Sequence, residues 1–532
     1  MNTQVAHIEY GKSLESPLSS LTFLLAVLAT AFLWIASSSA FAQTGDDAYR
    51  FAKRAPGLTA YSMGLSGTGI AGIADGSALF TNPAGLAWAD GSHFSGSLSG
   101  LRTLDKGAFK APGSSSELEN DVTASGLSNL SYLFKLPTVR GSMVIGAAFS
   151  QVSTFERSLL YDGDNSANSL TDYLMPLASE FTLQTDADGT YPEFDRTLSF
   201  MAFETYAIDL DQAKLDAGNS IPFTPAVTAG TLSQIGFVDE TGRMSEFSVG
   251  AAMEVAKGVM FGVSLNVPFG NYTFNRELNE EDYTNANDGF NGTTDIDKIR
   301  FRENVQSDIA GVNMRFGVSA VTQNNMTVGL TVETPTYYSI NDTYSTILST
   351  WFDNGDVFSY GGDDRDAGTG TFSYSIKTPW KIGVGGAFAV SGLRLALDFD
   401  YVDWSQMELD SKSYAFADEN QAITRGLDAT TNTRMSVSYA INERLEVIGG
   451  LAMYPDPHAT SLEVNGSKVD RDRRFVSAGV GYTFGKSMKA NVSWMGERFE
   501  DVYQVYTEVD NAPFVSEEVT RSRFQLGLTF GF

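Results

Sequence analysis

Residues 524–532 read FQLGLTFGF, with an apolar side chain at every second position. Phe524, Leu526, Leu528, Phe530 and Phe532 share one side, and small or polar residues occupy the other. Two residues is the side-chain period of a β-strand, so this stretch predicts a strand that is apolar on one face only. The buried last strand of a soluble sandwich shows the same pattern, so the fold depends on whether the pattern repeats.

The alternation returns along the chain. Further runs cover residues 247–255, 259–269, 380–390, 393–401 and 476–484. The second face of these strands is small or polar and includes Arg394, Asp398 and Asp400. A membrane barrel with a watery or plugged lumen needs such an inner face on every strand, whereas a sandwich core has little room for it. The sequence therefore predicts an all-β fold, a transmembrane antiparallel β-barrel.

The connections indicate the topology. We expect about 14 strands, an even number as in single-chain bacterial barrels, near residues 92–104, 122–137, 141–157, 243–256, 258–276, 300–321, 326–343, 371–390, 392–410, 428–441, 444–454, 472–484, 488–504 and 518–532. Tight turns are expected at 256–257, 323–325, 391–392, 442–443 and 485–486, where Asn and Gly supply the positive φ of short hairpins. Long acidic loops are expected at 157–242, 277–299, 344–370, 411–427, 455–471 and 505–517. Short turns at one end and long loops at the other are typical of outer-membrane barrels.

The N-terminus contains a candidate export signal. Leu18 to Ala36 form the only long apolar run, and Ala40-Phe41-Ala42 supply a small-x-small cleavage site before Gln43. We interpret residues 1–42 as a Sec signal peptide, although the segment before the run is poorly basic. A transmembrane anchor is the alternative, but no basic flank follows the run. Export through this signal and the barrel pattern place the chain in the bacterial outer membrane.

Composition excludes several function classes. The chain has no cysteine, and 64 Asp and Glu residues against 36 Lys and Arg give a net charge of −28. This charge argues against a nucleic-acid partner, because phosphate binding needs a basic stripe. The G-x-G-x-x-G match at 67–72 lacks the strand and helix of a dinucleotide fold. After residue 42 only His93 and His458 could serve as a histidine base, and neither accompanies a serine motif, so we expect no enzyme, no cofactor and no metal.

A glycine-rich stretch before the first strand carries a family resemblance. Residues 61–64 and 73–87 include Asn82, Pro83, Ala84 and Gly85, and they resemble the plug of the FadL/OmpP1/TodX family of outer-membrane transporters for hydrophobic compounds. Residues 378–380 with 397–406, and residues 449–457 with 472–484, are similar to later strands of that family. The three matches follow the family's order over nearly the whole chain from residue 57 onward.

The width of the barrel predicts a plug even without the resemblance. A barrel of about 14 strands is too wide for its own side chains to fill, so it is either open or blocked. Residues 43–91 precede the first strand and are rich in Gly, Ala and Ser. We expect them to form an N-terminal hatch in the lumen, ahead of a barrel over residues 92–532. A periplasmic tail without a gating role is the alternative.

The resemblance implies a function. Members of the family pass long-chain fatty acids or aromatic hydrocarbons, which dock among the external loops and leave sideways into the membrane near a kinked third strand. In this chain the third strand is Ser142 to Arg157, with Gly146 as one place where the pleat can break. We therefore expect passive, ligand-gated uptake of a hydrophobic small molecule. A general porin and a structural or secretion-associated barrel with a plug are the alternatives.

Candidate site residues fall in three groups. The longest loop holds apolar residues that either dock ligand or pack as a lid: Leu174, Met175, Leu177, Phe181, Phe200, Phe203 and Phe223. Arg394, Arg434 or Arg473 are candidates for a lumen cation that binds a carboxylate, or they pair with lumen acids. Phe532 is the expected C-terminal signal for the outer-membrane assembly machinery. The remaining partners expected are the ligand and outer-membrane lipid, with the chain as a monomer.

Overall fold

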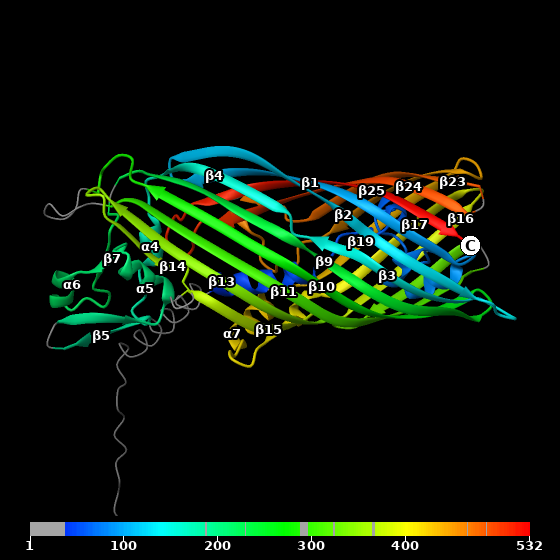
Figure 1. Cartoon of the computed structure of the whole chain (residues 1–532), viewed down its shortest axis with the longest axis horizontal. Coiled ribbons are helices and arrows are strands. Elements are labelled where there is room, and N and C mark those ends of the chain that lie inside the picture. Colours follow the sequence, from blue (N-terminus) through cyan, green and yellow to red (C-terminus); the bar gives the residue numbers. More distant parts are fainter. Residues whose placement is uncertain are drawn as a thin grey trace, which may run out of the picture.

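The alternating strands close into one barrel (Figure 1). The structure is a computed structural model and describes residues 38–186, 189–228, 230–287, 296–322, 325–363, 368–464, 467–485 and 487–532. Residues 1–37, most of the predicted signal peptide, lie outside the described residues. The barrel has 14 antiparallel wall strands, as predicted. Its first and last strands pair along their length, from His93 opposite Gly531 to Lys110 opposite Phe514, so the sheet has no free edge there.

Several wall strands are interrupted and carry two labels. In chain order the wall consists of β1 (His93–Ala111), β2 (Ser114–Leu136), β3 (Met143–Thr154) continued by β4 (Arg157–Asn165), β9 (Leu232–Ala256), β10 (Val259–Glu281), β11 (Ile296–Val321), β12 (Met326–Glu333) continued by β13 (Tyr337–Phe352), β15 (Thr369–Lys377) continued by β16 (Lys381–Val390), β17 (Leu393–Asp403) continued by β18 (Glu408–Asp410), β19 (Ala429–Ala440), β20 (Leu445–Tyr454), β23 (Arg473–Phe484), β24 (Met488–Gln504) and β25 (Phe514–Gly531). The short β14 (Val357–Gly361) pairs with β13.

The strands are longer than the sequence analysis predicted. β1 and β2 form one hairpin that turns at Gly113, where a connection was expected over 105–121. The predicted loop 157–242 begins with β4 and ends within β9. The strands expected over 326–343, 371–390 and 392–410 are each interrupted. The extensions were missed because their outward side chains are mostly small and polar, so hydrophobicity does not alternate there.

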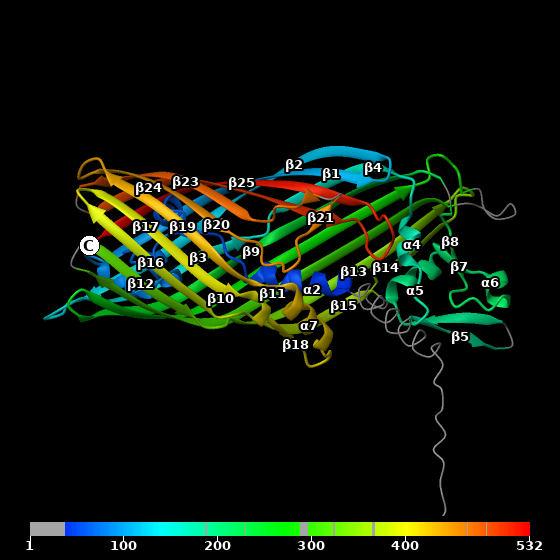
Figure 2. The ribbon, with the colours of Figure 1, turned by 180° about the vertical axis from the view of Figure 1, so that it is seen from behind.

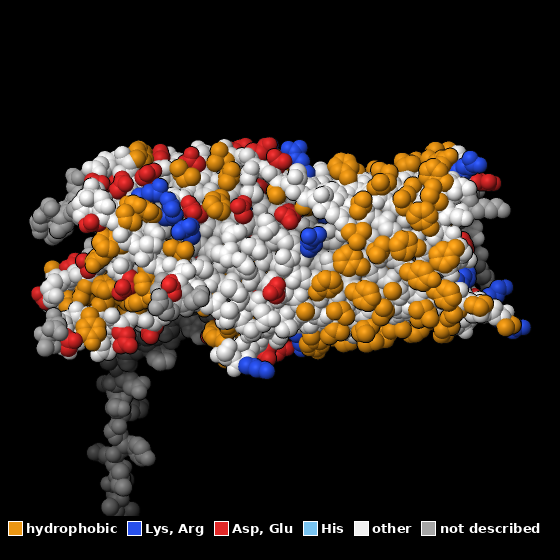
Figure 3. Space-filling view, in the orientation of Figure 1, with side chains coloured by type: hydrophobic (Ala, Val, Ile, Leu, Met, Phe, Trp, Pro, Cys, Tyr) orange, Lys and Arg blue, Asp and Glu red, His pale blue; other side chains and the backbone are white. Residues whose placement is uncertain are grey.

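The outer surface divides into two zones (Figure 3). At the end with the short turns, here called the turn end, an apolar band surrounds the wall. Its side chains include Phe247, Val267, Phe316, Ile382, Leu397, Val437, Val480 and Leu526, each at least 38% exposed. Beyond the band the middle of the wall is largely neither apolar nor charged, and charged and apolar side chains reappear toward the other end (Figure 3). No helix in the described part of the chain is long and apolar enough to cross a membrane.

A small subdomain lies beyond the other end of the barrel, here called the cap end (Figure 1). This cap comprises α4 (Leu170–Leu174), β5 (Phe181–Thr185), β6 (Thr190–Phe194), α5 (Thr197–Glu204), β7 (Ile208–Leu210), α6 (Gln212–Asp216) and β8 (Phe223–Pro225). Leu170 and Met201 of the cap belong to one buried cluster with Phe109, Phe301 and Leu348 of the wall. The apolar cluster therefore joins the cap to the barrel mouth.

The segment before β1 lies inside the barrel (Figure 2). This plug contains α2 (Ser38–Ala52), α3 (Ala60–Gly64) and two 3₁₀ turns, η1 (Gly76–Phe80) and η2 (Pro83–Trp88). The predicted cleavage site after Ala42 falls within α2. Side chains of Thr59, Asp75 and Asn82 cap the three short elements, which explains why the Gly-rich segment has a defined path. Two further helices, η4 (Trp404–Gln406) and α7 (Ala417–Gly426), and a hairpin of β21 (Glu463–Val464) and β22 (Ser467–Lys468), lie in the loops after β17, β18 and β20.

Candidate functional site

Asn82 fixes the plug to the barrel wall. Its Oδ1 accepts a hydrogen bond of 3.0 Å from the Ala84 N–H, which caps η2. Its Nδ2 donates to the Ile70 carbonyl within the plug at 2.6 Å and to the Val318 carbonyl of β11 at 3.1 Å. Asn82 and its neighbours Pro83, Ala84 and Gly85 are buried. The Asn-Pro-Ala-Gly stretch therefore acts as a wall anchor for the plug.

The wall makes room for the plug with glycines. A Cβ atom at Gly317 of β11 would lie 1.8 Å from the Asn82 Oδ1, and one at Gly329 of β12 would lie 1.9 Å from the Ile70 carbonyl oxygen. A Cβ at Gly262 of β10 would lie 2.4 Å from the Ala84 nitrogen. No real contact is that short, so these positions admit only glycine while the plug stays in place.

Two charged residues of β17 hold the neighbouring part of the plug. One carboxylate oxygen of Asp398 accepts the N–H groups of Gly69 and Ile70 at 2.7 and 3.0 Å. Arg394 donates to the Gly72 carbonyl at 2.8 Å. Arg394, a candidate lumen cation, therefore binds the plug backbone and does not line the central cavity described below.

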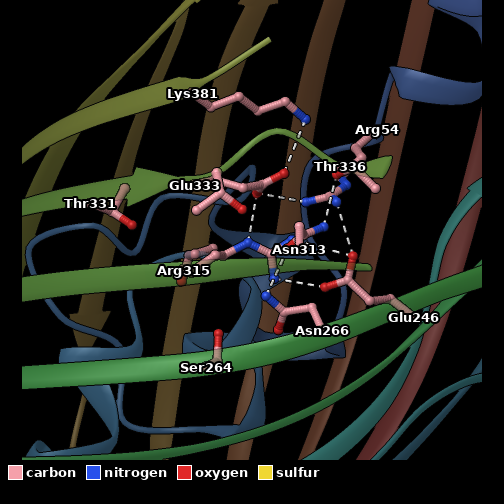
Figure 4. A network of polar contacts seen from close by, with 12 residues as sticks. Arg54, Glu246, Ser264, Asn266, Asn313, Arg315, Thr331, Glu333, Thr336 and Lys381 are labelled. Carbon is pink, nitrogen blue, oxygen red and sulfur yellow. Dashed lines mark hydrogen bonds and ion pairs between the residues drawn. The ribbon is translucent and has the colours of Figure 1, made fainter. Parts of the chain in front are cut away.

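An ionic network lies in the lumen (Figure 4), next to η1, where Arg315 donates a hydrogen bond of 3.1 Å to the Leu79 carbonyl. Arg315 of β11 contacts Glu246 of β9 and Glu333 of β12, both at 2.6 Å. Arg54 of the plug contacts the same two carboxylates, both at 2.9 Å. Lys381 of β16 adds a contact of 3.5 Å to Glu333. Three cations thus share two buried carboxylates, and Arg315 is 1% exposed, so the network joins plug and wall electrostatically.

A cavity of about 120 Å³ lies beside this network, between the plug and the wall. Its lining contains six cationic side chains, those of Lys53, Arg54, Arg315, Lys381, Arg434 and Arg473. Only two acidic side chains, Glu333 and Asp400, line it. Arg434 contacts Asp400 at 2.5 Å, and Arg473 contacts Glu497 at 2.6 Å. Glu246, Asp398 and Glu497 also pair with these cations from outside the lining, so six cations meet five carboxylates. Lys53 is the lining cation without an ion pair among the described residues, and it favours an anionic group in the cavity.

Arg434 and Arg473 were predicted from the sequence, but the other four cations of this cavity were not. A signal existed for Arg315, because Met314 and Phe316 are apolar and outward, which puts a charge on the inner face of β11. Lys381 has a similar signal between Trp380 and Ile382. The plug cations Lys53 and Arg54 have no periodic context, so the sequence gives no comparable signal for them.

The wall is discontinuous between β2 and β3. The two strands pair from Leu136 opposite Met143 to Asn129 opposite Ser150. A bulge follows between Gln151 and Ser153 of β3, and the described residues of β2 before Asn129 have no ladder partner on this side. Gly146 pairs regularly with Leu133 and Gly250, so the irregularity lies at residue 152 and not at Gly146.

A cavity of about 190 Å³ occupies this gap. Ser99, Leu101, Arg523 and Gln525 line it from the inner faces of β1 and β25. Gln151, Thr154 and Arg243 line it from β3 and β9. Residues of the inner and outer faces therefore meet in one cavity, which traverses the wall through the gap.

The predicted docking residues of the cap have different environments. Leu174 and Phe223 are fully buried in the cap. Met175, Phe181, Phe200 and Phe203 are partly buried, and Leu177 is 55% exposed. Phe181 packs edge-on against Phe223 at a centroid distance of 5.0 Å. Packing within the cap therefore accounts for most of these side chains. Ligand docking stays a prediction for those that are partly or largely exposed, such as Leu177.

A histidine links α2 to the loop after β20. His458 contacts Asp46 of α2 through Nε2 at 2.6 Å and Asp456 through Nδ1 at 2.5 Å. Burial disfavours its charge, but the hydrogen bonds to Asp456 and Asp46 outweigh this and raise the pKa of His458 to about 9. Tyr49 of α2 packs edge-on against Trp404 nearby, at 4.9 Å. A charged histidine and an aromatic pair thus fix the outer part of the plug.

Two further predictions concern the chain end and metals. Phe532 lies at the turn end, 72% exposed, and stacks on Tyr132 at a centroid distance of 6.0 Å. In the described residues no group of three or more His, Asp or Glu side chains is arranged to hold a metal ion.

Comparison with solved structures identifies the fold. The crystal structure of a Pseudomonas aeruginosa FadL homologue matches with a TM-score of 0.50 and 12% identity, over 90% of this chain and 99% of that one. The crystal structure of the P. putida toluene transporter TodX matches with a TM-score of 0.46 and 15% identity, over the same shares. No protein-family model and no curated protein matches the sequence. The chain therefore has the fold of the FadL homologue, in agreement with the resemblance found in its sequence.

Proposed function

We propose that this protein is a bacterial outer-membrane channel for ligand-gated, passive uptake of hydrophobic compounds that carry an anionic head group, such as long-chain fatty acids. The observation that carries the proposal is the cationic cavity beside the plug of a barrel with an apolar outer band. The apolar band supports a position in a membrane, with the turn end in the periplasm and the cap outside. The fold shared with the FadL homologue supports the transporter class.

The charges of the lumen favour a fatty acid over an aromatic hydrocarbon. Five of the six cations that line the central cavity are paired with acids, and Lys53 adds one further positive charge. A carboxylate there forms charge-assisted hydrogen bonds that toluene cannot form. The cavity of about 120 Å³ accommodates a head group and not a long acyl chain. Entry of the chain therefore requires movement of the plug, which makes the ligand itself the gating signal.

Lateral exit is part of the proposal. The gap between β2 and β3 joins the inner and outer faces of the wall near the cap-end edge of the apolar band. Leu98 and Leu127 are exposed there. An acyl chain that leaves there passes directly into lipid. It therefore avoids transfer to water, which would cost roughly 0.8 kcal/mol per CH₂.

The test is uptake by cells that lack their own transporter and express this chain. Labelled oleate and labelled toluene are compared, with expression of the Arg434→Gln, Arg473→Gln double variant as the matched control. The proposal expects oleate uptake above the empty vector and reduced uptake by the double variant. Uptake of toluene alone, or none of either by a folded barrel, would contradict it.

The porin alternative has a separate test. A barrel whose lumen contains residues 45–91 is expected to give near-zero conductance in a planar bilayer, whereas a porin conducts steadily. Removal of residues 43–91 is expected to produce a conducting barrel. Steady conductance of the intact chain would favour the porin, and a silent deletion variant that is correctly folded would argue against a blocking hatch.

A further inference from the structure

The outer wall carries a groove at the edge of the apolar band that faces the cap end. The depression has a volume of about 510 Å³ and lies on β3, β9, β10, β11 and β13. Its floor contains Ser245, Gly270, Ala310 and Ser339, whose small side chains create the hollow. The cap, the plug and the ionic network contribute no residue to its lining.

The strand register shows that chemistry changes across this groove in successive rows. On the apolar side, Phe247 pairs with Val267 and Val312 with Tyr337, all more than 40% exposed. The next row contains Ser245, Phe269, Ala310 and Ser339, and the row beyond it contains Arg243, Asn271, Asp308 and Asn341. Apolar, small and polar rows therefore follow one another along the barrel axis.

This order matches the order of groups in a lipid. If the apolar band marks the membrane, as under the proposed function, the groove lies where the head groups of the outer leaflet meet the wall. Phe149 and Phe269, whose rings lie 6.3 Å apart, form its apolar side. Acyl chains fit against these rings, and a head group fits the polar row.

Arg243 is an available cation for that head group. It is exposed and forms no direct ion pair with any residue in the described ranges, although the carboxylate of Glu156, which lines the wall gap with it, interacts with its charge. Asp308, the acid of the same row, lies two strands away on β11, a separation of about 10 Å at the usual strand spacing. A phosphate at Arg243 therefore avoids Asp308, which together with Asn271 and Asn341 can bond sugar hydroxyls.

We propose that this groove binds a phosphorylated glycolipid of the outer leaflet, with its phosphate on Arg243, its sugar on the row of Asn271, Asp308 and Asn341, and its acyl chains against Phe149 and Phe269. The proposal rests on the membrane position in the proposed function and not on the identity of the transported ligand.

The same arginine lies at the wall gap. Arg243 lines both the groove and the cavity between β2 and β3. Its guanidinium points into the gap toward β2, where a Cβ at Gly126 would lie 3.4 Å from Nη1, so the phosphate site lies on the β3 side of β9 and the polar row on the β10 side. A lipid bound at Arg243 therefore sits at the outer mouth of the proposed exit, so its occupancy is coupled to that route.

The test measures lipid binding directly. The full chain, delipidated in detergent, is titrated with lipid A carrying two phosphates and examined by native mass spectrometry. We expect one lipid A per barrel and about tenfold weaker binding by Arg243→Ala, because a charge-assisted phosphate contact is lost. The matched control is Arg302→Ala, since Arg302 is also exposed on the outward face of β11 but lies outside the groove.

Further arms separate the outcomes. Lipid A without phosphates is expected to bind wild type as weakly as lipid A binds Arg243→Ala, and millimolar inorganic phosphate is expected not to displace lipid A. Equal binding by Arg243→Ala and wild type, equal losses in both arginine variants, or displacement by free phosphate would overturn the proposal. Heat-modifiable gel migration confirms the folded barrel in each case. Lipid binding by a chain that transports nothing would leave this inference standing while the proposed function fails.

Discussion

Gly317→Ala tests whether the plug is built into the wall. The new methyl group would lie 1.8 Å from the Asn82 Oδ1 and 3.1 Å from Pro83 Cδ. The Ala84 N–H and the carbonyls of Ile70 and Val318 hold the Asn82 side chain in one position. Asn82 therefore cannot move away from the new methyl group without losing these hydrogen bonds. The substitution should therefore displace this part of the plug.

The magnitude follows from the bonds that are lost. Three hydrogen bonds at about 1 kcal/mol each give about 3 kcal/mol, and relief by small shifts reduces this to about 2–3 kcal/mol. Each 1.4 kcal/mol is a factor of ten, so the population with an unseated plug should rise by about 30- to 140-fold. Alanine in a strand is otherwise slightly better than glycine, so the sign of the effect distinguishes plug contact from strand propensity.

Single-channel recording measures that population as the frequency of opening events. Gly386→Ala is the matched control, because Gly386 also lies in a wall strand, β16, but a Cβ there meets nothing within 4 Å. We expect frequent openings in Gly317→Ala and none beyond wild type in Gly386→Ala. A silent Gly317→Ala barrel that folds normally and resists protease at the plug like wild type would refute the close seating.

Three further predictions concern other parts of the molecule. Arg315→Met should lower the free energy of unfolding by about 3–5 kcal/mol, because it leaves Glu246 and Glu333 short of a buried partner; urea titration of the barrel, with Arg302→Met as control, measures it. The contact of His458 with Asp46 should stabilise α2 fully below pH 6.5 and weaken as pH rises toward the raised pKa of about 9. Hydrogen exchange of α2, corrected for the intrinsic exchange rate, should therefore accelerate between these pH values in wild type. The His458→Asn variant should show no such acceleration. Deletion of Phe532 should reduce assembly in the outer membrane, measured as surface-exposed folded barrel, and unchanged assembly would show that the terminal aromatic is dispensable.

The sequence predicted the barrel because its evidence is local. One-sided alternation in residues such as 259–269 and 476–484 needs no knowledge of partners, and 14 wall strands follow from counting the alternating segments and turns. Strand lengths were wrong where outward residues are polar, as at Asp239 and Thr241 of β9, a strand that was predicted to begin at residue 243. Beyond the apolar band, the pattern that reveals a strand is absent although the backbone pairing continues.

The lumen and the gap could not be predicted in the same way. The ionic network joins residues 54, 246, 315, 333 and 381, and only the closed barrel brings them together. The gap depends on where the pairing of β2 with β3 ends, which is a property of two strands and their bulge. No single residue signals it, and the candidate Gly146 pairs regularly.

The contacts of the plug limit how it can open. Residues 69–84 are held by Asn82, by Asp398 and by glycine positions of three wall strands. Expulsion of the whole plug would break all of these contacts together with the pairs of Arg54, and each buried pair broken costs about 3–5 kcal/mol. Movement of residues 45–58 alone would break the contacts of His458 and Arg54, the 3.8 Å contact of Arg50 with Glu240, the hydrogen bond from the Ala55 N–H to the Val152 carbonyl, and the packing of α2. Because Arg315 and Lys381 continue to neutralise Glu246 and Glu333 when Arg54 leaves, the first segment of the plug is the part that can yield to an entering carboxylate at the least free-energy cost.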